Sequence, residues 1–236
     1  MNLACLCLLI PALACAADPL EIRVLFDNNA ASPAFEKGWG FAAALQMGGR
    51  GLLFDAGAAQ EIFVRNFDAM KLDASSFDRI MISHRHGDHT GGLRALEVRN
   101  PKLRILWPDP AEPYEVMPHF HSTGALNGPP PEQALVVETP NGLVIMTGCS
   151  HPGIVKLVEA ALKQRAGKPV RYLIGGFHML LHTPSQVSET IAALKKLNVE
   201  RVAPTHCTGE KAIAMFRDAW GPDFETVGAG RVIVLD

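Results

Sequence analysis

The sequence lacks an excess of positive charge. Its 236 residues contain 22 Lys plus Arg and 24 Asp plus Glu, which gives a formal net charge of -2. Proteins that bind nucleic acid usually present a basic face to the phosphates. The composition therefore predicts that nucleic acid is not a partner of this protein.

Cysteine is scarce beyond the start of the chain. Of the five cysteines, Cys5, Cys7 and Cys15 lie within the first fifteen residues, which leaves only Cys149 and Cys207 for the body of the protein. So few cysteines exclude a fold that rests on a framework of disulfides. The sequence leaves open whether Cys149 and Cys207 form a disulfide with each other.

The sequence also lacks an apolar run of the roughly 20 residues that a membrane-spanning helix needs, so no stable membrane insertion is expected. Residues 1–17 contain no Asp, Glu, Lys or Arg and end in small residues. They resemble a secretory signal peptide cleaved after residue 16, which predicts export, most simply to the periplasm. Because the usual Lys or Arg near the start is missing, two alternatives stay open: a lipid anchor on Cys15, or a mis-assigned start and a cytoplasmic protein.

No internal repeat, low-complexity tract or long linker divides residues 17–236, so one domain is expected. Short β-rich runs alternate with helical patterns, as in an α/β fold. Strands are expected at 22–26, 41–47, 52–55, 79–83, 103–107, 135–138, 143–147, 170–174, 201–203 and 231–235. Amphipathic helices are expected from Ile154, from Pro184 with Thr183 as N-cap, and over 212–220.

Residues 107–131 hold seven of the chain's 17 prolines. Proline donates no backbone hydrogen bond, so this stretch is predicted to be a long loop without a regular helix or central strand. Such a loop either shapes access to a site or crosses the surface. His119 and His121 in this stretch, like His182 further on, have no assigned role, although the first two could reach a substrate from the loop.

The sharpest chemical signal is a six-residue motif directly after the strand at 79–83. It contains His84, His86, Asp88 and His89. Alternation along the strand points His84 and His86 the same way, so both imidazoles can bind one ion. Asp88 and His89, on the turn that follows, face a neighbouring position. The motif predicts a metal site.

Two further histidines follow predicted strands in the same manner. His151 comes after the strand at 143–147, and His206 comes after the strand at 201–203. Loops at strand ends vary while the sheet fixes their origins, so functional sites gather there. We expect two metal positions, one held by His84, His86 and His151 and the other by Asp88, His89 and His206.

This pattern resembles the metallo-β-lactamase superfamily. The resemblance rests on the HxHxDH motif and on residues 53–57 before it, and it covers nearly the whole chain after the leader. Residues 27–29, 147–153, 174–178 and 204–209 resemble one branch, which includes the archaeal dihydropterin-methyl ribofuranosylaminobenzene phosphate synthases and many metal-dependent hydrolases. The resemblance implies an αββα sandwich with the site along one edge of its two sheets. It also implies two divalent metal ions, most often Zn2+, with Mn2+ or Fe as alternatives.

The resemblance further implies that Asp55 supports the metal-binding loop by hydrogen bonding, although Asp55 could instead cap a turn. Two departures stand out. Hydrolases of the superfamily take a ligand from a Gly-His-Thr segment where this chain has residues 129–133 without histidine, and His151 is expected to replace it. Those hydrolases also have a metal-bridging aspartate where this chain has Cys149, which is either a ligand or a packed thiol.

Two more side chains are candidates for the site. His178 ends an apolar strand after a Gly-Gly pair that would allow a close approach of ligand or backbone. It is expected to donate a proton or bind an anion, with a structural histidine as the alternative. Trp39, between two glycines, is either part of the core or a wall of the substrate site.

Together these features predict a hydrolase in which a metal-bound hydroxide attacks an ester, lactone or phosphoester of a small molecule. Asp88 would orient the nucleophile and His178 would protonate the leaving group. Two alternatives stay open: a pterin-transferring synthase that displaces pyrophosphate, against which export would speak, and a catalytically silent metal-binding module. The sequence does not indicate the substrate or the oligomeric state.

Overall fold

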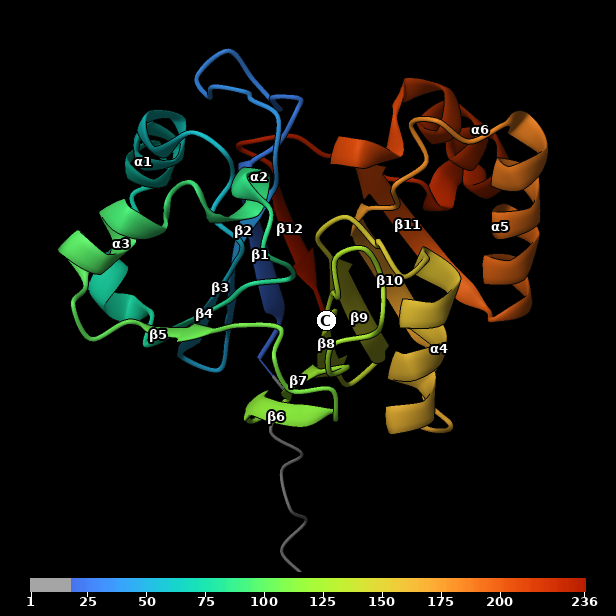
Figure 1. Cartoon of the computed structure of the whole chain (residues 1–236), viewed down its shortest axis with the longest axis horizontal. Coiled ribbons are helices and arrows are strands. Elements are labelled where there is room, and N and C mark those ends of the chain that lie inside the picture. The colour runs from blue at the N-terminus through green and yellow to red at the C-terminus, as the bar shows by residue number, and fades with distance from the viewer. Residues whose placement is uncertain (1–17) are drawn as a thin grey trace, which may run out of the picture.

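The structure is a computed structural model that describes residues 18–236, and the expected leader, residues 1–16, lies outside the described residues. Two six-stranded sheets pack face to face, with helices on the outer face of each (Figure 1). This arrangement confirms the expected αββα sandwich. No helix within residues 18–236 has the length and apolarity to cross a bilayer.

The first sheet has the strand order β12-β1-β2-β3-β4-β5. β3, β4 and β5 run parallel, and the other neighbours in this sheet are antiparallel. The strands are β1 (Leu20–Phe26), β2 (Ala42–Met47), β3 (Arg50–Phe54), β4 (Arg79–Met81), β5 (Arg104–Leu106) and β12 (Val232–Leu235). The parallel connections contain α1 (Gln60–Ala69), the 3-10 turn η1 (Ala74–Ser76), α2 (Gly87–Thr90) and α3 (Leu93–Arg99).

The second sheet has the order β11-β10-β9-β8-β7-β6, with β9, β10 and β11 parallel. Its strands are β6 (Tyr114–Met117), β7 (Phe120–Ser122), β8 (Leu135–Thr139), β9 (Gly142–Thr147), β10 (Val170–Gly176) and β11 (Val199–Thr205). The helical elements are α4 (Ile154–Gln164), α5 (Pro184–Lys196), η2 (His206–Thr208), α6 (Glu210–Trp220) and η3 (Gly221–Asp223). After η3 the chain returns to the first sheet as β12.

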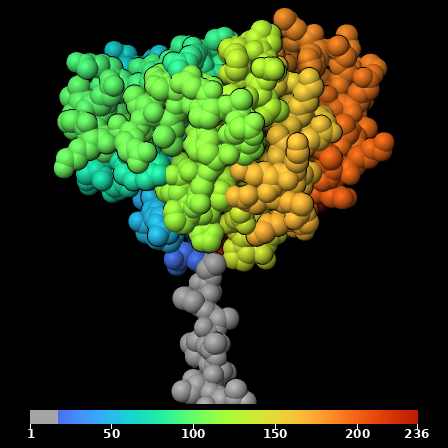
Figure 2. Space-filling view, turned by 60° about the horizontal axis from the view of Figure 1, so that its bottom comes forward, coloured from blue at the N-terminus to red at the C-terminus, as the bar shows by residue number. Residues whose placement is uncertain are grey.

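Three apolar clusters hold these layers together. One lies between the sheets and joins side chains such as Phe54 and Met146. A second packs α4, α5 and α6 on the second sheet, and a third packs α1 and α3 on the first. β9 is buried along its whole length because it is covered on both faces, which explains its continuous apolar sequence. On the surface, the first and second halves of the chain lie side by side (Figure 2).

The prediction that residues 107–131 form only a loop was wrong in part. β6 and β7 form an antiparallel hairpin inside this stretch, and β7 pairs with β8 as well. All seven prolines lie outside the two strands, so each strand keeps its amide donors. The prediction used the proline content of the whole stretch and therefore overlooked two short segments that contain no proline.

The helix that precedes β11 begins as its sequence predicts. Thr183 is the N-cap of α5 and Pro184 is its first residue. The side chains of Thr183 and Gln186 each accept the other residue's backbone N–H, which is a capping box. The expected strands appear with ends shifted by a few residues, whereas α1 and α3 were not predicted.

Candidate metal centre

The predicted ligands meet at one edge of the sandwich. β4, β9, β10 and β11 all end there, and the loops that follow them carry the functional side chains. His84 follows β4, Cys149 and His151 follow β9, His178 follows β10 and His206 follows β11. Parallel strands present their carboxyl ends to one edge, so residues far apart in the sequence come together.

The first group consists of His84, His86 and His151. The ring centres of His84 and His86 are 4.7 Å apart, those of His84 and His151 are 4.7 Å apart, and those of His86 and His151 are 4.8 Å apart. The Nε2 atoms of His84 and His151 are buried and have no hydrogen-bond partner. Their donor atoms fall into two overlapping sets, His84 with His86 and Asp88, and His84 with Cys149 and His151, so all three imidazoles lie close enough to contribute to a metal site.

The second group consists of Asp88, His89, Cys149 and His206, whose donor atoms all lie within 4.8 Å of one another. Asp88 Oδ2 is 3.4 Å from His206 Nε2 and 3.8 Å from His89 Nε2. Cys149 Sγ is 3.2 Å from His89 Nε2. The structure thus adds a thiol to the three ligands expected at this position.

Cys149 lies between the two groups. Its sulfur is within 4.8 Å of donor atoms of His84 and His151 as well as of the second group. The side chain is 3% exposed, and both Cys149 and Cys207 are free thiols. The position of Cys149 corresponds to that of a bridging ligand, and the two cysteines form no disulfide here.

Asp55 orients the rings of His84 and His89 by hydrogen bonds on the side away from the site. Its Oδ1 accepts the Ser83 N–H, and its Oδ2 accepts the Ser83 hydroxyl and His89 Nδ1, each at 2.7 Å. Because the Ser83 hydroxyl donates its only proton to Asp55, it accepts a hydrogen bond from His84 Nδ1 at 2.9 Å. Both rings therefore carry their proton on Nδ1 and turn an Nε2 lone pair towards the site.

Asn28 fixes His206 in the same way. Asn28 Oδ1 accepts the Gly40 N–H at 3.1 Å, which identifies it as the oxygen of the amide. His206 Nδ1, 2.9 Å from this oxygen, must therefore be the donor. Its buried Nε2 has no partner and faces Asp88. The sequence pointed to residues 27–29 only through the family resemblance.

Glu132 holds the loop that carries Cys149 and His151. It is fully buried, and its carboxylate accepts the backbone N–H groups of residues 148, 149, 150 and 151 at 2.8–3.1 Å. Burial raises the pKa of this carboxyl, and the amide donors oppose the rise. Sequence reasoning missed Glu132, although it stands where superfamily hydrolases carry their third histidine. Glu132 thus supports the loop that carries His151, the expected substitute ligand.

The Gly-Gly pair at the end of β10 lets this strand lie close to the backbone of the loop that carries Cys149, and not to a ligand. A Cβ atom on Gly176 would lie 2.4 Å from the Gly148 carbonyl oxygen and 2.6 Å from Cys207 Sγ. Because glycine leaves this space free, β10 can run against the loop that carries Cys149. Beyond the pair, Phe177 packs against Phe216 of α6, and His178 lies beside His151.

His178 and Trp39 flank the ligands. The His178 ring centre is 4.3 Å from that of His151, and its donor atom lies within 4.8 Å of Cys149 and Cys207. A hydrogen bond with Cys207 raises the pKa of His178. Trp39 is 51% exposed and its ring centre is 5.0 Å from that of His206. Trp39 is therefore a wall of the site and not part of the core.

The remaining histidines lie elsewhere. His121 is on β7, 3.2 Å from Glu138 and hydrogen-bonded to Arg165. His119 lines a separate cavity near Arg50. His182 lines a groove beside the site. The idea that His119 and His121 reach a substrate in the metal centre has no support in this arrangement.

The electrostatics favour metal binding at His84, His151 and Asp88, whereas a hydrogen bond with Cys207 and burial raise the pKa of the Cys149 thiol. Burial, together with the neighbouring imidazoles, lowers the pKa of His84, and the same causes lower the pKa of His151 to about 4. Burial opposes ionisation of Asp88, but the imidazoles of His206 and His89, when protonated, outweigh it and lower the pKa of this carboxyl. Neutral imidazoles and an ionised carboxylate are the forms that bind metals. With a thiol, this donor set suits Zn2+.

Comparisons with known proteins agree with the fold and the motif. No family model matches the chain. A 7,8-dihydropterin-6-methyl-4-(beta-D-ribofuranosyl)-aminobenzene-5'-phosphate synthase of Methanocaldococcus jannaschii is 28% identical over 92% of this chain and 97% of its own length. The crystal structure of Tm1679, described as a metal-dependent hydrolase of the β-lactamase superfamily, superposes with a TM-score of 0.75. It is 24% identical and covers 92% of this chain and 100% of that one.

The chain has the metallo-β-lactamase fold. Another member of this fold, Zn2+-bound PqqB from Methylobacterium extorquens, superposes with a TM-score of 0.55 at 12% identity, over 90% of this chain and 99% of that one. At such low identity the likeness shows the fold alone. As a metallo-β-lactamase-fold protein, the chain carries the His and Asp cluster at the expected edge of its sheets and departs from the usual pattern at Glu132 and Cys149.

Proposed function

We propose that this protein is a hydrolase that depends on a pair of divalent metal ions, most simply Zn2+, and acts on an ester, lactone or phosphoester of a small molecule. One observation carries the proposal. The Nε2 atoms of His84, His151 and His206 are buried without hydrogen-bond partners, and all three are in the cluster with Asp88 and Cys149. Unpaired polar atoms are costly to bury, so their gathering at one point favours a bound metal.

The residues divide between two positions. His84, His86 and His151 would hold one ion, and Asp88, His89 and His206 would hold the other, with Cys149 between them as a thiolate. Bound there, divalent ions would lower the pKa of a coordinated water and polarise the group under attack. The Asp55 and Asn28 hydrogen bonds keep three imidazoles aimed at these positions before any ion binds.

Two side chains of the protein would move protons. The Asp88 carboxylate is half-buried and ionised, so it can orient the attacking group by accepting its proton. His178 is exposed to solvent beside His151, and its raised pKa favours the protonated ring. A protonated His178 can donate to the leaving group.

The test pairs a ligand substitution with a neighbouring control. His86→Ala should remove turnover of a panel of phosphodiesters, aryl esters and lactones, and it should lower the metal content found by elemental analysis. Arg85→Ala should change neither, because Arg85 points away to Asp109, at 2.7 Å, and stacks on Trp107. Full activity in metal-free protein would contradict the proposal. Stoichiometric metal with no turnover of any substrate would indicate a silent metal-binding module.

A second candidate is a pterin-transferring synthase that displaces pyrophosphate. The 28% identity to the archaeal synthase, over 92% of the chain, favours this alternative. Incubation with a dihydropterin pyrophosphate and a phosphorylated ribofuranosyl-aminobenzene distinguishes the two activities. A condensation product with release of pyrophosphate would establish the synthase, and hydrolysis alone would exclude it.

A further inference from the structure

A groove of about 750 Å3 opens beside the metal centre. Its walls are the segment around Asn28 and Trp39, the loop from Met179 to Pro184, and the first turns of α6. His206 lies in the same wall, so the groove is continuous with the second metal position. A substrate that reacts at the metals can therefore extend into this groove.

The groove gathers exposed apolar side chains. Trp39 is 51% exposed, Leu180 is 58% exposed and Leu181 is 93% exposed, and all three line it together with Met179 and Met215. Half of the six large apolar side chains that are exposed within residues 18–236 thus lie in one place. Such a concentration beside a site indicates a surface for an apolar ligand.

The apolar residues favour an aromatic ligand in particular. Trp39 stands next to the His206 ring, at 5.0 Å between ring centres, where it can pack against a ring held near the metals. Methionine sulfur atoms make favourable contacts with aromatic rings, and the two methionines line the same groove. Leu180 rests on Gly209, where a Cβ atom would come within 2.8 Å of its side chain, so the loop packs closely on α6.

The groove also carries two lysine side chains that form no ion pair within residues 18–236. Lys37 and Lys211 are exposed and line it, and neither forms an ion pair within the described residues. α6 begins here with Gly209 as an N-cap that offers no side-chain hydrogen bond, which leaves first-turn amides free. The Glu210 carboxylate is the opposing charge in the groove. Two lysines and a helix N-terminus against one carboxylate favour an anionic group on the ligand.

We infer that the groove binds the non-reacting part of the substrate, and that this part is an aromatic ring carrying an acidic group separate from the bond that is broken. The ring packs against Trp39, and the acidic group lies near Lys37 and Lys211. This inference rests on the proposed function, because the groove serves the metal centre only if the substrate reacts there.

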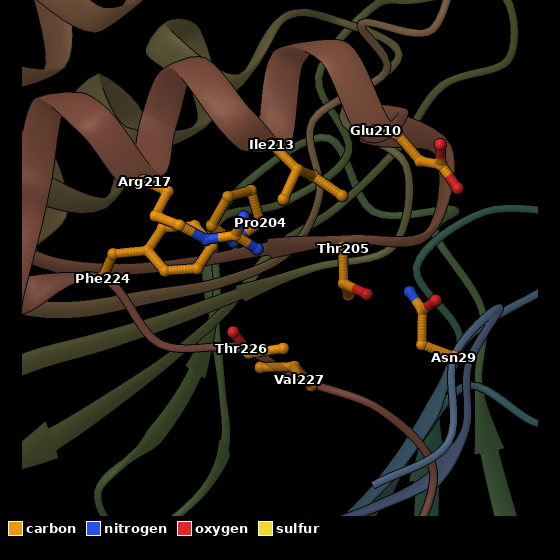
Figure 3. Close-up of a pocket in the computed structure, with 9 residues that line it drawn as sticks. All are labelled: Asn29, Pro204, Thr205, Glu210, Ile213, Arg217, Phe224, Thr226 and Val227. Carbon is orange, nitrogen blue, oxygen red and sulfur yellow. The ribbon is translucent and has the colours of Figure 1, made fainter.

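A second hollow supplies the control. It has a volume of about 290 Å3 and shares Asn29, Glu210 and Ile213 with the groove (Figure 3). Figure 3 shows Ile213 and Arg217 projecting from α6 towards the segment that carries Phe224. The Arg217 guanidinium lies over the Phe224 ring at 5.0 Å. Arg217 is an exposed cation on the same helix as Lys211, but it lines only this smaller hollow.

The experiment measures binding and not turnover. Naphthalene-2-sulfonate and its neutral match, naphthalene-2-sulfonamide, are titrated calorimetrically into the full chain with and without EDTA. A sulfonate is a poor metal ligand, so its affinity reports the groove. Trp39→Ala should weaken both probes by about tenfold. Lys211→Gln should weaken the sulfonate by about threefold and leave the sulfonamide unchanged. Arg217→Gln should change neither.

Three results would overturn the inference: no binding of naphthalene-2-sulfonate to the unsubstituted protein, equal binding by the Trp39 variant, or equal losses from Lys211→Gln and Arg217→Gln. The outcome is separate from that of the proposed function. The expected binding pattern with no hydrolysis would refute the hydrolase and keep the groove. Hydrolysis without this binding pattern would support the hydrolase and refute the inference about the groove.

Discussion

Single residues behind the ligands determine which nitrogen atoms face the metals. Asp55 accepts hydrogen bonds from the Ser83 hydroxyl and from His89 Nδ1, and through Ser83 it also sets the tautomer of His84. Such hydrogen bonds hold a ligand ring in place and make its free nitrogen more basic. The role that the resemblance implied for Asp55 matches these contacts.

Glu132→Gln should destabilise the protein and loosen the metal centre. One amide nitrogen would replace a carboxylate oxygen that accepts backbone N–H groups, so at least one buried donor would face another. We expect a loss of about 2–3 kcal/mol in the free energy of unfolding, measured by urea denaturation. Glu97→Gln, on the exposed face of α3, should cost less than about 0.5 kcal/mol. Equal losses would show that Glu132 has no special role.

Cys149 should give a spectroscopic signature when the protein is loaded with Co2+. A thiolate ligand produces a charge-transfer band in the near ultraviolet, so the unsubstituted protein should show that band and Cys149→Ser should lack it. Cys207→Ser should retain the band, because only Cys149 lies within reach of both ligand groups. If Cys207→Ser lost the band and Cys149→Ser kept it, Cys207 and not Cys149 would be the thiolate ligand.

Asp27 should make the stability of the metal-free protein depend on pH. Its carboxyl is fully buried and accepts the Thr205 hydroxyl at 2.6 Å, and burial raises its pKa from 3.8 to about 6. The folded state therefore holds the proton more tightly than the unfolded state. Its stabilising contribution is complete below pH 3.8 and is lost as the pH rises through 6, with a total of about 3 kcal/mol.

Asp27→Asn mimics the protonated group and should remove this loss. Urea denaturation in EDTA at pH 4, 5, 6 and 7 compares the variant with the unsubstituted protein. The difference in the free energy of unfolding should grow in favour of the variant from pH 4 to pH 7. A difference that stays constant over this range would contradict a raised pKa.

Secondary-structure elements fix where the loops of the site begin. α5 starts directly after the loop that carries Leu180 and Leu181, and Pro184 and Val187 at its start line the groove. The capping box at Thr183 ends this loop at a defined residue. The loop and the first turn of α5 therefore form one unit.

Thr183→Ala should lower the free energy of unfolding by about 1 kcal/mol, because it removes the acceptor for the Gln186 N–H. Thr190→Ala is the matched control within the same helix. Thr190 bonds only to the Gln186 carbonyl of its own helix, so its replacement should change stability by less than about 0.5 kcal/mol. Chemical denaturation measures both. Equal effects would show that the cap does not stabilise α5.

At the scale of the whole molecule, the metal centre joins the two halves of the chain. The loops of the first sheet supply His84, His86, Asp88 and His89, and those of the second sheet supply Cys149, His151 and His206. A metal bound by residues of both sets of loops would hold the two sheets together at this edge. Metal binding should therefore stabilise the fold as a whole.

Removal of metal with EDTA should lower the Tm by about 5–10 °C, since binding at a hundred times Kd adds about 2.7 kcal/mol. Addition of Zn2+ should restore it. Thermal unfolding followed by circular dichroism measures the shift. His86→Ala should show a smaller shift than Arg85→Ala. An unchanged Tm in EDTA, with metal shown to be absent, would refute the role of metal in stability.

Prediction from the sequence succeeded where a local rule governs the structure. The HxHxDH spacing, the capped start of α5 and the apolar runs of the inner strands each depend on nearby residues. It failed at β6 and β7, where the prolines of the turns concealed the strands. It also did not decide whether Trp39 is part of the core or a wall of the site, because the exposure of a side chain depends on segments distant in the sequence.

The sequence by itself determined the fold class, through the family resemblance, and predicted the histidines and aspartate of the candidate centre, because residue type and spacing are enough to indicate metal-binding chemistry. Only the tertiary structure decided that Cys149 lies between the two ligand groups, that Glu132 holds its loop, and that Trp39 and Lys211 share a groove. These relations join residues up to 172 positions apart by number. They depend on how strands of both sheets end at one edge of the fold, which the local sequence does not specify.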